Sequence, residues 1–258
     1  MDLKIATLLI TGGSDGIGKG LAKRFIEAGS TVIITGRDES KLKQAADEMP
    51  GLHTYVNDIS DPAQRELLAL HIQNNFSSLN ILINNAGIQR RISLADDDAL
   101  WPERQAEIDT LLSAPVHLNH LLIPLILNSD KPGTIVNVTS GGAYIPQVFA
   151  PVYSACKAAL HSYTITLRHA LADTACRVIE LIPPAVQTSL AGAGNAHGAP
   201  LDEFCDSVFK QLTQGNAISI GFGPTENLTQ QISGKPLDEL FLASAGRVKV
   251  NTYRGEKM

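Results

Sequence analysis

Short runs of consecutive apolar, mostly β-branched residues alternate along this chain with longer segments in which apolar residues recur every three to four positions. Consecutive apolar residues are typical of strands buried on both faces of a parallel sheet, whereas the longer spacing is typical of helices. The predicted strands span residues 5–11, 31–35, 53–56, 81–84, 134–140, 177–182 and 217–222. The predicted helices span residues 16–28, 39–48, 62–75, 103–128, 154–173 and 201–214.

This alternation predicts successive strand–helix–strand units, because parallel neighbours in a sheet need a long connection between them. We therefore expect an α/β fold of the Rossmann type, with about seven strands in a doubly wound parallel sheet and helices on both faces. No repeat or linker divides the chain, so residues 1–258 are predicted to form one domain. The small residues at 192–200 predict a loop between a strand and a helix.

Composition and charge exclude several classes of protein. Of the 258 residues 44% are hydrophobic and 18% charged, and the net charge of −5 does not suit a nucleic-acid or membrane-surface partner. The longest apolar stretch, at 121–127, contains Pro124 and is too short to span a bilayer. The N-terminus has no signal-peptide pattern, and three widely spaced cysteines predict neither a disulfide framework nor a metal site. We expect a cytoplasmic protein.

A glycine-rich stretch, TGGSDGIG at 11–18, lies between the first predicted strand and the first predicted helix. Glycines permit a tight turn and a close backbone approach, and a helix N-terminus attracts a pyrophosphate. The stretch therefore predicts a dinucleotide site, although such a turn can also be a purely structural connection. The residues of this stretch that we place in the predicted site are Gly12, Ser14, Gly16, Ile17 and Gly18.

The residues after the second predicted strand bear on the choice between NAD and NADP. An acidic residue there accepts hydrogen bonds from the adenosine ribose in NAD-binding folds, whereas an arginine suits a 2′-phosphate. Gly36 occupies the acidic position, and Arg37 follows it. We predict NADP(H) in preference to NAD(H), although Asp38 would weaken the preference and Arg37 could equally be a solvated charge opening a helix.

Tyr153 and Lys157, in the sequence YSACK, are one helical turn apart and therefore share one helix face. A lone pair of this kind is usually two ordinary surface side chains. Here TGGSDGIG, NNAG at 84–87, Ser140 and YSACK occur together, and their order and spacing resemble the short-chain dehydrogenase/reductase family in its compact branch. The resemblance covers residues from about 5 to about 190 and implies a single NAD(P)-binding domain.

A weaker likeness points to one group within that family. The stretches APVYSACKAAL, PPAVQT and LDEFCDSVFKQL resemble the oxidoreductases named after the D-alanyl-lipoteichoic acid operon.

The resemblance implies a catalytic role for three residues. Tyr153 would give a proton to a carbonyl oxygen or remove one from an alcohol. An unperturbed phenol has a pKa near 10, which Lys157 and the charge of the oxidised nicotinamide would lower. Lys157 would also bind the nicotinamide ribose, and Ser140 would hold the substrate oxygen against Tyr153. Ser140 could instead be a simple turn serine.

The resemblance also implies contacts to the cofactor. Asp58 and Ile59 would lie at the adenine, although Asp58 could simply cap a helix. NNAG would line the adenosine-ribose side of the cofactor, although NNAG alone could be a simple turn at the end of a strand. The stretch after the sixth strand would bind the carboxamide, although Pro183-Pro184 replaces the family's Pro-Gly there. The further cofactor residues implied in this way are Asn85, Ala86, Gly87, Val186 and Thr188.

One position departs from the family pattern. Leu111 stands where the family has an asparagine that helps to hold a water linking the lysine to solvent. Pro115 has no N–H to give to the Leu111 carbonyl, so it should kink the helix and leave that carbonyl free. We predict that the free carbonyl holds the water; the alternative is that Leu111 marks weakened catalysis.

Together these features predict an NADP(H)-dependent oxidoreductase acting on a small, mainly apolar carbonyl or alcohol substrate. A catalytically weakened NADP(H)-binding sensor or scaffold is the alternative. The region at about 188–214 is expected to contact the substrate, and the predicted helices at 103–128 and 154–173 to form the contacts of a homodimer or homotetramer. The substrate wall is predicted to come from residues 88–96, 141–150 and the loop after Thr188, and Ala143, Ile145, Val148, Phe149 and Leu190 should make it mainly apolar. The histidines on these helices are expected to be ordinary packing or surface residues.

Overall fold

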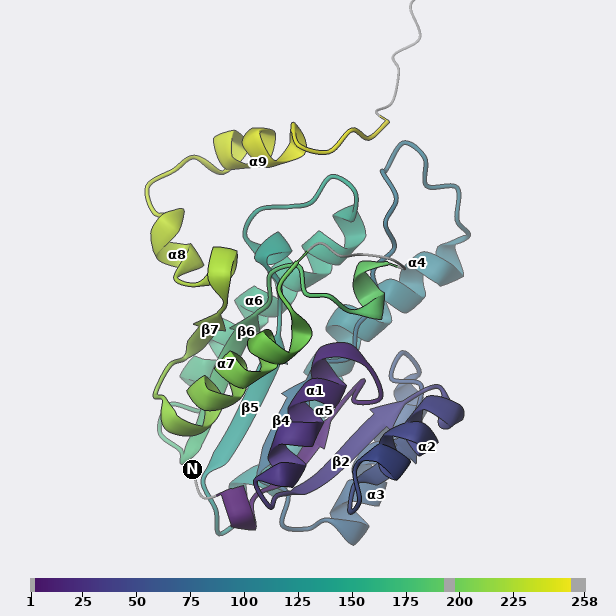
Figure 1. Cartoon of the computed structure of the whole chain (residues 1–258), viewed down its shortest axis with the longest axis vertical. Helices are drawn as coiled ribbons and strands as arrows, with labels where there is room; N and C mark the ends of the chain where they lie inside the picture. Colours follow the sequence, from purple (N-terminus) through teal and green to yellow (C-terminus); the bar gives the residue numbers. More distant parts are fainter. Residues whose placement is uncertain (1–2, 193–197, 252–258) are drawn as a thin grey trace, which may run out of the picture.

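A parallel sheet of seven strands in the order β3-β2-β1-β4-β5-β6-β7 forms the centre of the computed structural model, which describes residues 3–192 and 198–251 (Figure 1). All six neighbouring pairs run parallel, which confirms the predicted fold class. The strands are β1 (Thr7–Ile10), β2 (Thr31–Gly36), β3 (His53–Val56), β4 (Ile81–Asn84), β5 (Gly133–Val138), β6 (Cys176–Ile182) and β7 (Ser219–Gly221).

Helices cover both faces of the sheet, as predicted (Figure 1). They are α1 (Gly16–Glu27), α2 (Glu39–Glu48), α3 (Pro62–Asn75), α4 (Trp101–Ile108), α5 (Ala114–Leu127), α6 (Pro151–Ala170), α7 (Leu201–Gln214), α8 (Leu228–Gln231) and α9 (Leu237–Ala245). Successive side chains of a strand point to opposite faces. Leu8 and Ile10 therefore pack in one core with α1 and α7, and Leu9 packs in the other with α3 and α5.

The sheet has a switch point between β1 and β4. The chain builds β2 and β3 outward on one side of β1 and β5 to β7 outward on the other. The loops that follow β1 and β4 therefore run in opposite directions along the sheet, and a crevice opens between them at the carboxyl ends of these strands. This is where the glycine-rich stretch and NNAG were predicted to lie.

The helix predicted over 103–128 differs from a regular helix. It begins at Trp101 and consists of α4 and α5 joined by a π-helical turn over Asp109–Ser113, in which the Ala114 N–H donates to the Asp109 carbonyl. Pro115 lies directly after this turn. The predicted irregularity is therefore present, as a widened turn.

The same segment, Trp101–Leu127, is long and apolar enough to cross a membrane by length and composition alone, with a mean hydropathy of 1.5. Core helices of soluble proteins pass the same test. Leu118, Leu122 and Ile126 of this segment pack in the core against the sheet.

Two C-terminal helices were not predicted. α8 has only four residues and follows Asn227, whose φ of +54° places it in the left-handed region. α9 contributes no buried side chain to the described part of the chain, and its Leu242 is 68% exposed. Because neither helix has a core-facing stripe, the apolar periodicity that revealed the other helices is missing here.

Candidate functional site

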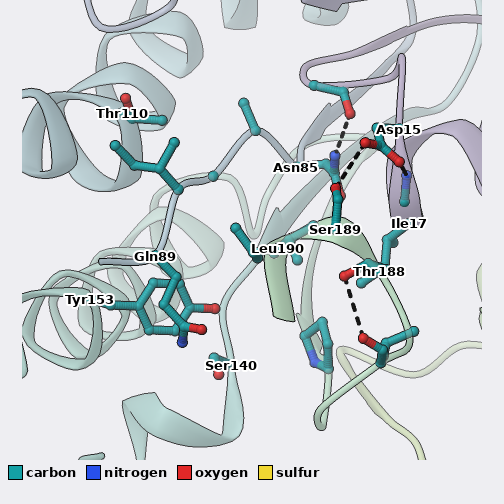
Figure 2. Close-up of a pocket in the computed structure, with 18 of the residues that line it drawn as sticks. Asp15, Ile17, Asn85, Gln89, Thr110, Ser140, Tyr153, Thr188, Ser189 and Leu190 are labelled. Carbon is teal, nitrogen blue, oxygen red and sulfur yellow. Dashed lines mark hydrogen bonds between the residues drawn. The ribbon is translucent and has the colours of Figure 1, made fainter. Parts of the chain in front are cut away.

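A cavity of about 960 Å³ lies in the crevice at the carboxyl ends of the central strands (Figure 2). Every predicted catalytic or cofactor residue except Gly18 lines it. These residues are Gly12, Ser14, Gly16, Ile17, Arg37, Asp58, Ile59, Asn85, Ala86, Gly87, Ser140, Tyr153, Lys157, Val186 and Thr188. Among the described residues, no group of histidine, cysteine, aspartate or glutamate side chains is arranged to hold a metal ion.

The glycine turn is shaped by close contact with the end of β4. Gly12 has a φ of +63°, and a Cβ there would lie 2.8 Å from the Cα of Ala86. A Cβ at Gly18 would collide with the Gly12 carbonyl oxygen and lie 2.5 Å from Nδ2 of Asn85. Gly18 therefore lets α1 pack against the turn and does not itself line the cavity.

Asp15 is a residue of this turn that the motif did not single out. Its carboxylate caps α1 by accepting a hydrogen bond of 2.7 Å from the Gly16 N–H. It also accepts from the Ser189 hydroxyl at 2.8 Å and from Lys41 Nζ at 3.0 Å, so it joins α1, α2 and the segment after β6 at the cavity mouth (Figure 2). Burial acts to raise the pKa of Asp15, but the hydrogen bonds from Ser189 and Lys41 outweigh it and lower the pKa.

Of the charged residues that follow β2, Asp38 has a structural role and Arg37 has no partner in the described ranges. Asp38 caps α2, because its carboxylate accepts from the Lys41 N–H at 3.1 Å. Arg37 is exposed, lines the cavity, and has no side-chain hydrogen bond or ion pair to any residue in 3–192 or 198–251. A Cβ at Gly36 would lie 2.9 Å from Ser14 Oγ. An acidic side chain at position 36 would therefore require Ser14 to move.

Asp58 does not cap a helix, which was one of its two readings. Its Oδ1 accepts from the backbone N–H of Ser60 at 3.0 Å and from the Ser60 hydroxyl at 2.7 Å, while Asp61 is the N-cap of α3. Asp58 thus stabilises the turn after β3 and faces the cavity beside Ile59.

Ser140, Tyr153 and Lys157 meet at one end of the cavity. Ser140 does form a turn, since its Oγ accepts from the Gly142 N–H at 3.1 Å, and its hydroxyl also forms a hydrogen bond with Tyr153. Lys157 Nζ donates to the Val138 carbonyl at 2.6 Å and lies 5.7 Å from the centre of the Tyr153 ring.

Burial is the largest influence on the pKa values of Tyr153 and Lys157. It raises the pKa of Tyr153, the hydrogen bond with Ser140 lowers that pKa in part, and the charge of Glu107 raises it further. Burial also lowers the pKa of Lys157 to about 8. The lowered Tyr153 pKa that was expected with the oxidised cofactor is therefore absent from the ligand-free chain, in which burial has the largest effect.

Glu107 was not predicted from the sequence. This residue of α4 is only 1% exposed, and its carboxylate accepts from the Arg90 N–H at 3.1 Å. Burial raises its pKa. In the sequence it resembles any other acidic residue at the start of a helix, and only the packing of α4 against α6 reveals its influence on Tyr153.

A second buried carboxylate, Glu180 of β6, lies behind the catalytic residues. It accepts hydrogen bonds from the hydroxyls of Thr139 at 2.7 Å and Tyr144 at 3.0 Å, and His161 Nδ1 lies 2.9 Å from it. Thr139 and Tyr144 flank the Ser140 turn, and His161 is one turn beyond Lys157 on α6. Burial acts to raise the pKa of Glu180, but these partners lower it. His161 is therefore a packing residue with a specific hydrogen-bonding partner.

Leu111 lies beside Lys157, as the family pattern implies. Its side chain is buried and would lie 3.4 Å from a Cβ at Gly87. Leu111, Pro115 and Lys157 line a small gap that is narrower than a water molecule. The predicted water at the Leu111 carbonyl would require this gap to widen, and it stays a prediction.

The substrate wall differs in part from the predicted one. Phe149 and Leu190 line the cavity, whereas Ala143, Ile145 and Val148 do not. Polar side chains also line this end, although the wall was expected to be mainly apolar. Gln89, Arg91 and Gln147 come from the predicted ranges, and Thr110 comes from outside them. Gln89 lies on the same side of the cavity as Tyr153 and Ser140 (Figure 2).

Comparison with known proteins agrees with the motifs. The family model described as short chain dehydrogenase matches residues 6–199. The uncharacterized oxidoreductase DltE of Bacillus subtilis is 46% identical over 184 residues, covering 71% of this chain and 73% of the relative. Sulfoacetaldehyde reductase 2 of Chromohalobacter salexigens is 32% identical over 184 residues, covering 70% and 73%.

Solved structures share the fold. A short chain dehydrogenase from Burkholderia cenocepacia in complex with NADP superposes with a TM-score of 0.81 at 24% identity, covering 95% of this chain and 99% of that one. A short chain dehydrogenase/reductase from Burkholderia phymatum in complex with NAD gives 0.82 at 18% identity, covering 98% and 100%. Because these two hold different cofactors, the fold alone does not distinguish NADP from NAD.

The burial of Lys157 predicts a stability cost. Its pKa of about 8, against an ordinary 10.5, corresponds to at most about 3 kcal/mol. The cost is fully present below pH 8 and disappears as the pH rises toward 10.5. Lys157→Met should therefore raise the free energy of unfolding of the ligand-free protein at pH 7, by an amount that shrinks in alkali. Urea unfolding across this pH range measures it, with the exposed Lys210→Met as control, and equal stability at pH 7 would contradict it.

The burial of Glu107 predicts the opposite pH dependence. Because its folded pKa is raised above the ordinary 4.5, the wild-type protein loses stability as the pH rises past that value. Glu107→Gln keeps an acceptor for the Arg90 N–H and removes the charge. The variant should melt at the same temperature as wild type near pH 4 and at a higher temperature at pH 7. Glu27→Gln, at an exposed position on α1, should show no such divergence, and a lower melting temperature for Glu107→Gln at pH 7 would refute the assignment.

Proposed function

The chain belongs to the short-chain dehydrogenase/reductase family, and we propose that it is an NADP(H)-dependent oxidoreductase that interconverts a small carbonyl compound and its alcohol. The observation that carries this proposal is the convergence of Ser140, Tyr153 and Lys157 at one end of a cavity whose other end is the glycine turn. The single-domain organisation of residues 1–258 and the substrate region at about 188–214 are part of the proposal. Residues 193–197 of that region lie outside the described residues.

The cavity residues fit a dinucleotide. Gly12 and Gly16 line the cavity beside the N-terminus of α1, which favours an anion. Asp58 and Ile59 would hold the adenine end, and Val186 and Thr188 the carboxamide end. When bound, the nicotinamide supplies or accepts the hydride.

The chain's own residues would handle the proton. Tyr153 is protonated in the ligand-free chain because burial raises its pKa, so it can donate to a carbonyl oxygen. Ser140 would donate a second hydrogen bond to the same oxygen and stabilise its developing negative charge. Lys157 would bind the ribose through N–H groups not used by Val138, and its charge would favour the phenolate left after transfer.

Arg37 supports a preference for NADP(H). Its guanidinium is exposed at the cavity and has no carboxylate partner in the described ranges, while Asp38 is committed to the cap of α2. An exposed, unpaired arginine suits a 2′-phosphate, because guanidinium–phosphate hydrogen bonds are charge-assisted.

The names of relatives support carbonyl–alcohol chemistry. One is a sulfoacetaldehyde reductase and another, from Agrobacterium fabrum, is a serine 3-dehydrogenase. Phe149 and Leu190 supply the apolar walls expected for a small substrate. A cytoplasmic location, the absence of nucleic-acid and membrane partners, and a homodimer or homotetramer formed through α4, α5 and α6 stay predictions.

The alternative function, a sensor or scaffold with weakened catalysis, rests on Leu111. A leucine beside Lys157 offers no side-chain hydrogen bond to a relay water.

The first test follows NADPH consumption with a panel of small aldehydes and ketones. Tyr153→Phe should lower kcat by about 100-fold or more, because it removes the proton donor and leaves the ring packing intact. Tyr163→Phe, on the same helix but outside the cavity, is the matched control and should retain activity. Turnover that survives in Tyr153→Phe would refute the assigned role. If none of the compounds is reduced but NADPH still binds tightly, the result would favour the sensor.

The cofactor preference is tested by Arg37→Gln. Loss of charge-assisted hydrogen bonds to a 2′-phosphate should raise KM for NADPH by about 10- to 100-fold and leave KM for NADH nearly unchanged. Lys43→Gln removes the same charge from a position on α2 that does not line the cavity, and should alter neither constant. An equal change in KM for both cofactors would show that Arg37 does not read the phosphate.

A further inference from the structure

We propose that Arg91, with Gln89 and Gln147, forms an anion subsite, so that the preferred substrate carries a carboxylate, sulfonate or phosphate group at the end remote from its carbonyl. This inference rests on the proposed function and narrows its substrate class. It changes the expectation of a mainly apolar substrate into that of a short apolar skeleton with one charged end.

Arg91 is held in position at the substrate end of the cavity. Its guanidinium carbon lies 4.3 Å from the centre of the Phe149 ring, and Nη1 donates to Gln89 Oε1 at 3.2 Å. Gln89 Nε2 in turn donates to Gln147 Oε1 at 3.2 Å. The Gln147 N–H donates to the Ser154 hydroxyl at 3.0 Å, which ties the row of side chains to α6, one residue after Tyr153. The guanidinium therefore has a defined location relative to the catalytic residues.

The neighbouring residue, Arg90, has a structural role, in contrast to Arg91. Arg90 forms two hydrogen bonds with Asp97, at 2.7 and 3.1 Å, and its N–H donates to Glu107. These contacts fix the loop that carries both arginines. Arg91 makes no ion pair with any residue in 3–192 or 198–251, so no carboxylate in these ranges neutralises its charge. A positive charge stacked on an aromatic ring and left without a counter-ion is suited to bind an anion.

Hydrogen-bond donors remain available in this row. Nη1 of Arg91 is used by Gln89, and neither Nε nor Nη2 has a partner within the described part of the chain. The Gln147 amide nitrogen likewise has none there, while its oxygen is used by Gln89. An anionic group could therefore accept hydrogen bonds from the guanidinium and from an amide N–H, and charge-assisted bonds of this type are the stronger ones.

The charges around the cavity place an anion at this end. The acidic residues that line it are Asp15, Asp38 and Asp58, and all three lie at the glycine turn or after β2 and β3, on the adenosine side. Near Ser140 and Tyr153 the charged lining residues are Arg91 and Lys157. Phe149 and Leu190 provide apolar contact for the atoms between the anionic group and the carbonyl.

The test measures kcat/KM with NADPH for a series of ω-oxo carboxylic acids of increasing chain length, each beside its methyl ester. The wild-type protein should prefer the best acid over its ester by about 10- to 100-fold. Arg91→Gln should reduce this ratio to about one, mainly through a higher KM for the acid, and Arg91→Lys should restore it in part. Lys210→Gln, which removes an exposed charge from α7, should leave the ratio at its wild-type value.

Two results would overturn the anion subsite: a wild-type ratio near one at every chain length, or equal losses on acid and ester in Arg91→Gln. Turnover of uncharged carbonyls in either case would leave the proposed oxidoreductase function intact. If no carbonyl compound is reduced, the proposed function fails. The anion subsite is then tested separately, by measuring the binding of an anion. Succinate should then bind the NADP⁺ complex of the wild-type protein and not that of Arg91→Gln, and equal binding to both would reject it.

Discussion

The hydrogen bonds between the ends of β1 and β4 determine where the rest of the site lies. The Thr11 hydroxyl accepts from the N–H groups of Asn85 and Ala86, both at 3.0 Å, and the Asn85 amide donates back to the carbonyls of Thr11 and Gly12. These bonds cross the sheet where the strand order reverses, so they hold the two diverging loops at a fixed separation. The glycine turn can then pack against Ala86 without a Cβ between them.

Three buried charged or polar groups surround the catalytic end, and each has a different balance of burial and partners. Glu180 has hydrogen-bond donors enough to remain ionised. Glu107 and Lys157 have fewer partners. Burial raises the pKa of Glu107 and lowers that of Lys157, and both changes favour the neutral form of the side chain. Such groups destabilise a fold and are common where chemistry requires them. In this chain Glu107 and Lys157 lie close to Tyr153, and the apolar cores on the two faces of the sheet offset their cost.

The strands and most helices could be predicted because each carries its own signal. β1, β4 and β5 are buried along their whole length and contain adjacent apolar residues, and the glycine turn and YSACK have characteristic spacings. What could not be predicted depends on contacts between distant segments. Asp15 meets Ser189 across 174 positions, and Glu180 meets Thr139 across 41. The free charge of Arg91 became evident only when Asp97 was seen to pair with Arg90.

The carboxylate of Asp15 uses the same hydrogen-bond donors that a phosphate at the N-terminus of α1 would use. The first N–H of α1 already donates to a carboxylate, and Lys41 already has a counter-ion. A pyrophosphate bound at this helix end would exchange one anion for another, so its net gain would be the difference between two similar interactions. A smaller net gain shortens the residence time of the dinucleotide. An anion supplied by the chain itself would in this way favour release of the spent cofactor after each cycle.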